Sequence, residues 1–501
     1  MTEFLKCCFK TLSPVHLGCD EVYEPTGFVV DEEENRLVVF DTATFLAELE
    51  ETKLQTFSAI CKKGTLSSIL EIYKFLRNQK PIGRNVAVSE GFVNHYRKTL
   101  QIPGGDERKI QQELNQFIIA RTAFLPSTDR PYIPGSAVKG ALRTAYLNHL
   151  ARSHSPRGTN NAKALELELL DGGSFDTDPF RMLKVSDFMP VGEIKTKILY
   201  AVNEKKKPSK FAARGPSQIL EVILPGAEFE GSITLETPDA KSNIREALTM
   251  ETLLGSLNDF YLSREKTREH EELVSIGVND SMPSLDGALG LLRVGRHSGA
   301  ESVTIEPYRQ IRIMGEKGKP PRTEKNATTL WLAADHDKPS VKKDLKPFGW
   351  AVLVKIENEQ ATSFAQRETA WRKENESERS RLFAQAQAEL ATRAEQARIA
   401  EVLARNKQLE EEHKLAEDAA RKEAMAHMSS EEKAVEELND PRTPENRIYE
   451  IYNQIDTFKD QQLVARALKE VWVKTNKWTK KQCTPKQWTK VKRVKEILGE
   501  N

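Results

Sequence analysis

The sequence is poor in cysteine and lacks the patterns in which cysteine carries chemistry. Its five cysteines form no Cys-x-x-Cys pair, and no histidines stand at the spacing of a zinc finger. These absences argue against a structural metal and against a disulfide framework. A Walker-type pattern for nucleotide hydrolysis is also missing. We therefore expect reduced thiols, no metal ion and no cofactor.

Long apolar runs are missing as well. The N-terminal stretch MTEFLKCCFKTLSPVHLG contains no apolar segment of signal-peptide length, and no uncharged stretch of the chain approaches the length of a membrane span. The sequence thus predicts a soluble, cytoplasmic protein without a membrane partner.

The chain has almost no net charge. Its 75 Lys and Arg nearly balance its 74 Asp and Glu, which gives a formal charge of +1. Attraction to an anionic partner must therefore come from local clusters of like charge. Because 501 residues exceed one ordinary hydrophobic core, we expect about two or three structural units.

Three regions differ in composition. Residues 1–355 mix short strand-like runs with helical patterns and frequent Gly and Pro, which predicts an α+β region. Residues 356–440 are rich in Ala, Glu, Arg, Lys and Gln, which favours a long charged helix. Its apolar positions follow no strict heptad, so a dimeric coiled-coil-like arm and a solvated helical arm both remain open. Residues 441–501 have the pattern of a small basic helical module.

The segment YIPGSAVKGALRTA joins an extended run to an Ala-rich helix through a Pro-Gly-Ser turn. Gly135 permits the tight turn, and Ser136 is a favourable N-cap, so we expect the helix to start there with free N–H groups. Such a helix start attracts a phosphate, and Lys139 and Arg143 share one face of the helix. Gly140 leaves room for a closely approaching group. A surface helix with an ordinary cap and two solvated cations explains the same residues.

Two further segments have a composition suited to phosphates. The loop LRVGRHSGAESVT places Arg296 and Ser298 between Gly295 and Gly299, a pattern that can wrap backbone around phosphates. Between two strand-like runs, NEKKKPSKFAARGPS offers Phe211 as a stacking ring. The same segment carries five cations: Lys205, Lys206, Lys207, Lys210 and Arg214. A solvated loop at the tip of a hairpin is the alternative.

In this order, the motifs resemble those of the RAMP superfamily of CRISPR-associated RNA-binding proteins. YIPGSAVKGALRTA is similar to the superfamily signature, and LSPVHLGCDEVYEPTGFVVD is similar to its N-terminal start. DPFRMLKVSDF and LEVILPGAEFEGSI are similar to its middle, and VGRHSGAES to its glycine-rich loop. The combination most resembles the fifth subunits of type III-A effectors, the Csm complexes, and covers residues 1 to about 355.

The resemblance implies a ferredoxin-like, RRM-related RAMP core that binds CRISPR RNA and caps the effector on the side of the guide 3′ end, in antiviral defence. As a subunit of such an effector the chain would have other Csm subunits as partners. We also expect target RNA at the basic hairpin, and a trimming nuclease in crRNA maturation at the basic C-terminal module. Carried over onto this sequence, the resemblance assigns the signature and the glycine loop to RNA binding: Gly135, Ser136, Lys139, Arg143, Gly295, Arg296, Ser298 and Gly299. The basic hairpin matches the family only loosely, so its five cations are predicted from their charge alone.

We expect no catalysis by this chain. The resemblance places a catalytic Asp of related backbone subunits in a loop upstream of the signature, whereas Asp129 lies directly before the signature, too close for that role. His16 has the chemistry of a general base, but the sequence offers it no paired acid or base. The alternatives are a metal-independent endoribonuclease that processes CRISPR RNA, another RAMP subunit of a type III effector, and a helical scaffold protein.

The C-terminal region combines tryptophans with charge of one sign. Residues 471–495 hold nine Lys or Arg, no Asp or Glu, and three tryptophans: Trp472, Trp478 and Trp488. In proteins that bind single-stranded nucleic acid, cations pair with phosphates while rings stack on bases. The same tryptophans are natural core residues of a small module, so the charge asymmetry alone favours a nucleic-acid surface.

Overall fold

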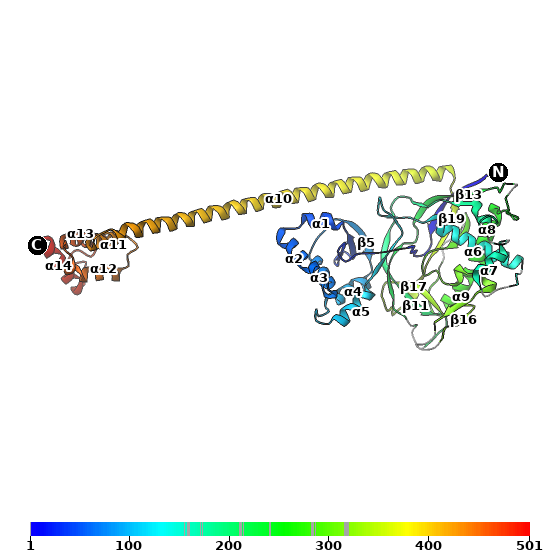
Figure 1. The fold of residues 1–501 in the computed structure, drawn as a ribbon, viewed down its shortest axis with the longest axis horizontal. Coiled ribbons are helices and arrows are strands. Elements are labelled where there is room, and N and C mark those ends of the chain that lie inside the picture. Colours follow the sequence, from blue (N-terminus) through cyan, green and yellow to red (C-terminus); the bar gives the residue numbers. More distant parts are fainter. Residues whose placement is uncertain are drawn as a thin grey trace. The chain divides into compact units, whose positions relative to one another are not determined.

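The computed structural model describes residues 2–154, 156–157, 161–170, 172, 174–209, 213, 215–239, 242–281, 285, 287–314 and 320–500. The chain divides into two compact units, Met1–Gln385 and Ala386–Asn501, which are described separately. Helix α10 (Asn358–Ala426) begins in the first unit and continues into the second (Figure 1).

The first unit combines sheets and helices, as the predicted α+β class requires. Its first sheet has the strand order β10–β13–β1–β19–β14, with β9 also pairing with β13, and every pairing is antiparallel. Its strands are β1 (Thr2–Thr11), β9 (Leu183–Val185), β10 (Met189–Pro190), β13 (Glu228–Glu236), β14 (Ala288–Arg293) and β19 (Trp350–Lys355).

Two helices pack against this sheet and against each other, α6 (Gly135–Ser153) and α8 (Met250–Leu257). The helical spacing of Val138, Leu142 and Ala145 places all three in the core, where they are buried together with Phe9 and Phe229 of the sheet. The signature segment therefore supplies a core helix. Only the residues left over from this packing are available for other contacts.

The second sheet of the first unit has the strand order β2–β6–β12–β11–β5–β4–β3, and β17 pairs with both β11 and β18. Its strands are β2 (Gly18–Val22), β3 (Phe28–Asp31), β4 (Arg36–Val39), β5 (Arg84–Val88), β6 (Ile119–Thr122), β11 (Thr196–Lys205), β12 (Gln218–Ile223), β17 (Thr329–Ala334) and β18 (Lys346–Pro347). The antiparallel pairing of β11 with β12 confirms that the basic segment connects two strands of a hairpin.

A separate core lies between this sheet and three helices, α3 (Leu66–Leu76), α4 (Glu90–Leu100) and α5 (Glu107–Gln116). The first unit contains further strands and helices. They are β7 (Phe124–Leu125), β8 (Arg130–Pro131), β15 (Ile311–Ile313), β16 (Arg322–Glu324), α1 (Thr42–Glu48), α2 (Glu51–Lys62), α7 (Ala162–Leu169), α9 (Thr267–Ser275), η1 (Pro179–Met182), the π-helix η2 (Asn258–Lys266), η3 (Glu301–Val303), η4 (Glu306–Tyr308) and η5 (Lys342–Asp344).

The first turns of α10 are bound to the first unit by side chains rather than left in solvent. Phe364 packs into a small core cluster. Arg130 pairs with Glu368 at 2.7 Å and lies 3.6 Å from the centre of the Trp371 ring. Arg367 pairs with Glu228 at 2.6 Å. The start of the long helix is therefore part of the first unit's packing.

The second unit contains the rest of α10 followed by α11 (Ser430–Asn439), α12 (Glu445–Asn453), η6 (Ile455–Thr457), α13 (Gln461–Lys474) and α14 (Pro485–Leu498). Trp472 is buried in its core, and Trp478 and Trp488 pack partly buried against that core. The three tryptophans thus hold this module together. Among the residues that the structure describes, no helix is long and apolar enough to cross a lipid bilayer.

Candidate nucleic-acid interface

The glycine loop lies directly on the N-terminal motif. Gly295 has a φ of +87°, and a Cβ at this position would lie 2.4 Å from the His16 carbonyl oxygen. The next residue, Arg296, donates its backbone N–H to the same oxygen at 2.9 Å, and the Gly349 N–H donates to the Pro14 carbonyl at 2.9 Å. Only glycine combines this backbone conformation with so close an approach. Two motifs from distant parts of the sequence therefore form one surface.

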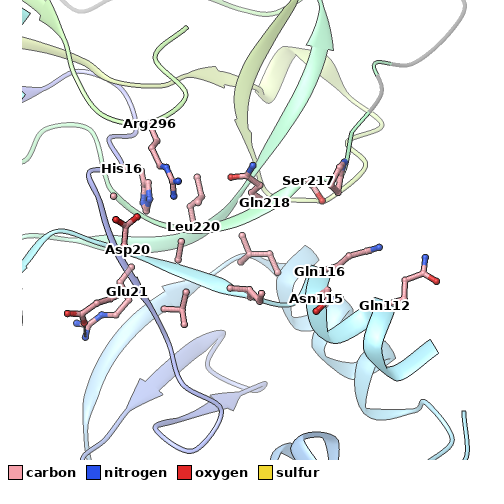
Figure 2. A pocket seen from close by; sticks show the side chains of 17 residues that line it. His16, Asp20, Glu21, Gln112, Asn115, Gln116, Ser217, Gln218, Leu220 and Arg296 are labelled. Carbon is pink, nitrogen blue, oxygen red and sulfur yellow. Dashed lines mark ion pairs between the residues drawn. The ribbon is translucent and has the colours of Figure 1, made fainter. Parts of the chain in front are cut away.

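A cavity of about 540 Å³ opens beside this contact. Figure 2 shows His16 and Arg296 next to each other, with the amide side chains of α5 and the start of β12 across from them. The amide and hydroxyl groups belong to five residues: Gln112, Asn115, Gln116, Ser217 and Gln218. The cavity is also lined by two exposed carboxylates, Asp20 and Glu21. A ligand that carries phosphate would therefore place it against Arg296, with its sugar or base edges at the neutral donors and acceptors.

Arg296 is the cation of this cavity with a free head group. Its side chain is exposed and lies along Gly18, whose Cβ would stand 3.1 Å from the Arg296 Cδ. Within the part of the chain that the structure describes, its guanidinium has no hydrogen bond or ion pair. Arg121, which also lines the cavity, pairs instead with Asp129 at 2.5 Å and with Glu21 at 4.0 Å. Arg296 can therefore contact a phosphate without losing an internal partner.

His16 is buried and serves the local structure. Its Nδ1 lies 2.7 Å from the Glu221 carbonyl oxygen, which accepts only, so Nδ1 carries the proton. The Nε2 atom is also buried and has no hydrogen-bond partner among the described residues. Burial, reinforced by the charge of Arg296, lowers the pKa of His16. The ring is therefore neutral near pH 7 and its free nitrogen does not face solvent.

Asp129 belongs to a group of ion pairs beside the cavity. Its carboxylate forms an ion pair with Arg84 at 2.7 Å and accepts a hydrogen bond from Arg121 at 2.5 Å. Arg84 also pairs with Glu221 at 3.1 Å and donates to the Tyr23 hydroxyl at 2.5 Å. Both oxygens of Asp129 are thus engaged by cations. This arrangement positions β5, β6 and β12 relative to one another.

The signature turn differs from its prediction in one respect. The expected N-cap at Ser136 is wrong: α6 begins at Gly135, its N-cap is Pro134 without a side-chain hydrogen bond, and Ser136 is exposed inside the first turn. The Gly135 N–H donates to Asp187 Oδ1 at 2.8 Å. A carboxylate of the chain itself therefore occupies part of the helix start that was predicted to attract a phosphate, because a distant loop brings Asp187 there.

The two signature cations have partners within the chain. The Lys139 ammonium donates to the Leu183 carbonyl at 2.7 Å, and burial lowers the pKa of Lys139. Arg143 pairs with Asp178 at 2.8 Å and Glu166 at 3.2 Å. None of the signature residues lines the cavity described above. RNA contact through Lys139 and Arg143 stays a prediction, and it requires exchange of these partners.

Gly140 behaves differently from Gly135 in the same helix. A Cβ at Gly140 would meet no described atom within 4 Å, whereas a Cβ at Gly135 would lie 2.4 Å from the Val185 carbonyl oxygen. Gly135 is thus required by the packing of the chain itself. The room at Gly140 is open, and its use by RNA stays a prediction.

The basic hairpin divides into residues with different surroundings. Lys206 is buried, with its ammonium 2.5 Å from Glu301 and 3.0 Å from Glu272. Although burial opposes it, the charges of Lys206 and Arg268 lower the pKa of Glu301 to about 2. Lys206 therefore acts as an internal ion-pair partner. Lys205 donates to Ser209 at 3.1 Å and Lys207 is exposed. Lys210, Phe211 and Arg214 lie outside the described residues.

The other residues of the glycine loop shape it from inside. Ser298 is buried and donates its hydroxyl to the Gly295 carbonyl at 2.8 Å, and Gly299 has a φ of +85°. His297 packs against Trp331 and Phe348, with ring centres 4.7 and 5.5 Å away. From the sequence we predicted neither the packing role of His297 nor the contribution of the α5 amides to the cavity. The run QQELNQ on an amphipathic helix was the available signal for those amides.

Comparison with known proteins places the chain in a family. The model of the RAMP superfamily (RAMPs) matches residues 8–290. The chain belongs to the RAMP superfamily.

Within that superfamily the chain is similar to two curated relatives. It is 27% identical over 265 residues to the CRISPR system Cms protein Csm5 of Streptococcus thermophilus, which covers 48% of this chain and 66% of that protein. It is 24% identical over 207 residues to the protein of the same name from Methanocaldococcus jannaschii, which covers 39% of this chain and 45% of that protein. The chain thus matches less than two thirds of the length of these relatives.

A solved structure described as a Csm–crRNA–target RNA ternary complex of a type III-A CRISPR-Cas system also matches. One of its chains aligns with 70% of this chain and 100% of its own length, at 20% identity and a TM-score of 0.44.

Proposed function

We propose that this chain is a non-catalytic CRISPR RNA-binding subunit of a type III-A (Csm) effector complex in the cytoplasm. In this proposal it caps the side of the guide 3′ end, next to other Csm subunits and target RNA, and takes part in crRNA maturation with a trimming nuclease. Membership of the RAMP superfamily and similarity to two proteins named Csm5 support the proposal. The observation that carries it is the cavity where Arg296 of the glycine loop meets the N-terminal motif.

The proposal assigns the RNA-binding region to residues 1–355, with a ferredoxin-like core. The antiparallel order β9–β13–β1–β19 supports this assignment, because α6 lies between β1 and β9 in the chain and α8 between β13 and β19. Strand–helix–strand–strand–helix–strand is the order of elements in a ferredoxin-like unit. The helical arm, residues 356–440, and the basic module, residues 441–501, then extend this core.

A non-catalytic role fits the surroundings of the two residues that could have served catalysis. The free nitrogen of His16 is buried, so it does not reach a ribose hydroxyl at the surface. The carboxylate of Asp129 is held by Arg84 and Arg121. A general base must lie within hydrogen-bond reach of the proton that it removes, so the burial of His16 and the ion pairs of Asp129 support a non-catalytic role.

In the proposed binding mode, a phosphate of the guide RNA lies against Arg296, and the neighbouring nucleotide faces the amides of α5 and β12. We expect Arg296→Gln to weaken binding of a single-stranded guide RNA by roughly tenfold, since a hydrogen bond to a charged group contributes about 1.5 kcal/mol. The slope of log K against log salt should fall by about 0.7, which corresponds to one phosphate contact. Fluorescence anisotropy over a salt series measures both quantities.

Arg312→Gln is the matched control, because Arg312 is an exposed arginine of the same unit that does not line the cavity. It should keep the wild-type slope. Equal slopes in wild type and Arg296→Gln would show that Arg296 does not contact an RNA phosphate.

The function as a whole is tested by purifying the tagged chain with the other Csm subunits and sizing the RNA that accompanies it. We expect bound RNA with a defined 3′ region, protected without metal or turnover. Purified alone, the chain should leave naked precursor RNA intact. Shortening of that RNA would instead support the processing endoribonuclease, and retention of all protein partners without any RNA would support a scaffold.

A further inference from the structure

The C-terminal module has a strongly one-sided charge. Residues 461–501 contain eleven Lys or Arg and three Asp or Glu, whereas residues 427–460 contain four Lys or Arg and nine Asp or Glu. The acidic part forms α11, α12 and the segments around them, and the basic part forms α13, α14 and the turn between them. Although the whole chain is nearly neutral, residues 461–501 are thus strongly positive.

The tryptophan rings of this positive segment make contacts within the module. Trp472 is 4% exposed and packs on Tyr452, with ring centres 5.6 Å apart. The Lys495 ammonium lies 5.5 Å from the ring centre of Trp478 and 5.9 Å from that of Trp488. These rings face the module's core and a lysine of the chain. The ring of Trp472 is therefore not available to stack on bases, and the rings of Trp478 and Trp488 are partly occupied by contacts within the module.

Four of the nine cations in residues 471–495 have partners within the module. Lys477 pairs with Glu445, and Arg493 pairs with Asp456. Lys490 lies 4.2 Å from the ring centre of Tyr449, and Lys495 covers the two tryptophan rings. These four residues contribute to the folding of the module.

The other five cations are exposed and unpaired. Within residues 427–500, all of which the structure describes, they have no hydrogen bond, ion pair or ring contact. We call them the lysine surface: Lys474, Lys480, Lys481, Lys486 and Lys492. They run from the last turn of α13 through the connecting turn and along α14, whose Val491 and Val494 point into the core.

A protein partner is a poor match for this surface. Protein interfaces have an apolar centre, and lysine is depleted there. Among the described residues from 461 onward, the large apolar side chains that are exposed are Leu463 and Val473. Unpaired lysines without an apolar centre are instead suited to a polyanion, whose phosphates replace counterions at each ammonium group.

We propose that the lysine surface is a second RNA-binding surface of the chain, one that holds the phosphate backbone and does not read the bases. It lies in a different unit from the cavity at Arg296 and does not depend on the function assigned to that cavity. Because Trp472 is in the core and the other two rings pack against it, we expect binding to rest on phosphate contacts, and therefore to be sequence-independent and strongly salt-dependent.

The test uses the full chain with four lysines changed to glutamine: Lys480, Lys481, Lys486 and Lys492. The probes are twenty-nucleotide oligo(U) and oligo(A) RNAs. We expect the salt slope to fall by about 2 to 3 for both RNAs, since each phosphate contact of a single strand contributes about 0.7. Combining the four changes with Arg296→Gln should add the two effects, because the sites share no residue.

The matched control changes four exposed cations of α10 in the same unit to glutamine: Arg398, Arg405, Lys407 and Lys414. It has the same change in charge and should keep the wild-type slope. The unfolding temperature of the lysine variant should not fall, because removing like charges from one segment relieves repulsion. Wild-type slopes in the lysine variant would overturn the proposal. Loss of a co-purifying Csm subunit with an unchanged RNA slope would also overturn it and identify the surface as protein-binding.

Discussion

Gly135→Ala should strongly destabilise the first unit, whereas Gly140→Ala in the same helix should stabilise it. At Gly135 the new methyl group would lie 2.4 Å from the Val185 carbonyl oxygen and 2.6 Å from that of Ser186, both backbone atoms that cannot turn away. Overpacking of this kind destabilises by about 3 kcal/mol. At Gly140 the methyl group meets nothing within 4 Å, so the gain is the helix propensity of alanine, about 1 kcal/mol.

Urea denaturation of the two variants, followed by circular dichroism, gives both free energies of unfolding. Changes of the same sign would contradict the packing described for α6. Because Gly140→Ala should be stable, its RNA binding can also be measured. Weaker binding at an unchanged salt slope would mean that RNA approaches α6 at Gly140, as the signature motif predicts.

Glu301→Ala should destabilise the first unit by about 3 to 5 kcal/mol, because it leaves the buried Lys206 ammonium with an incomplete set of partners. Glu301 is 1% exposed and accepts from Lys206 at 2.5 Å and from the Ala327 N–H at 2.8 Å. The double variant Lys206→Met/Glu301→Leu should recover most of the loss, since it removes both charges and keeps their volume. If the double variant lost as much free energy of unfolding as Glu301→Ala, the loss would not come from the unpaired Lys206 charge.

The same pair predicts a dependence of stability on pH. Since the pKa of Glu301 falls from 4.5 to about 2 on folding, its contribution is complete above the unfolded value and is lost as pH falls through the folded value. The wild type should therefore lose more stability than the double variant between about pH 5 and pH 2. Thermal unfolding at a series of pH values measures the difference, and parallel curves would contradict it.

The sequence predicted those features that depend on local pattern. The pattern of YIPGSAVKGALRTA predicted the helix that α6 forms, and the composition of residues 356–440 predicted helix where α10 and α11 form. Motif order predicted the superfamily. In each case the information lies in neighbouring residues, which fix the period or the propensity directly.

The features that escaped prediction depend on partners far away in the chain. Ser136 has the chemistry of an N-cap, but Asp187 arrives from another loop and Pro134 ends the extended segment. Lys206 belongs to a run of lysines, yet the fold places it between Glu272 and Glu301. A pattern of charges shows which groups are present, whereas burial decides which of them solvent or RNA can reach.

Main-chain hydrogen bonds join the N-terminal segment to two places: the glycine loop, where Arg296 donates to the His16 carbonyl, and the residue before β19, where Gly349 donates to the Pro14 carbonyl. A contact of this kind fixes the backbone of the glycine loop and of the N-terminal segment. Gly295 tolerates no side chain there, whereas the buried ring of His16 is held separately, by the Glu221 carbonyl. Distant proteins that share this junction should be recognisable by the placement of their glycines and by backbone geometry long after residue identity between them has faded.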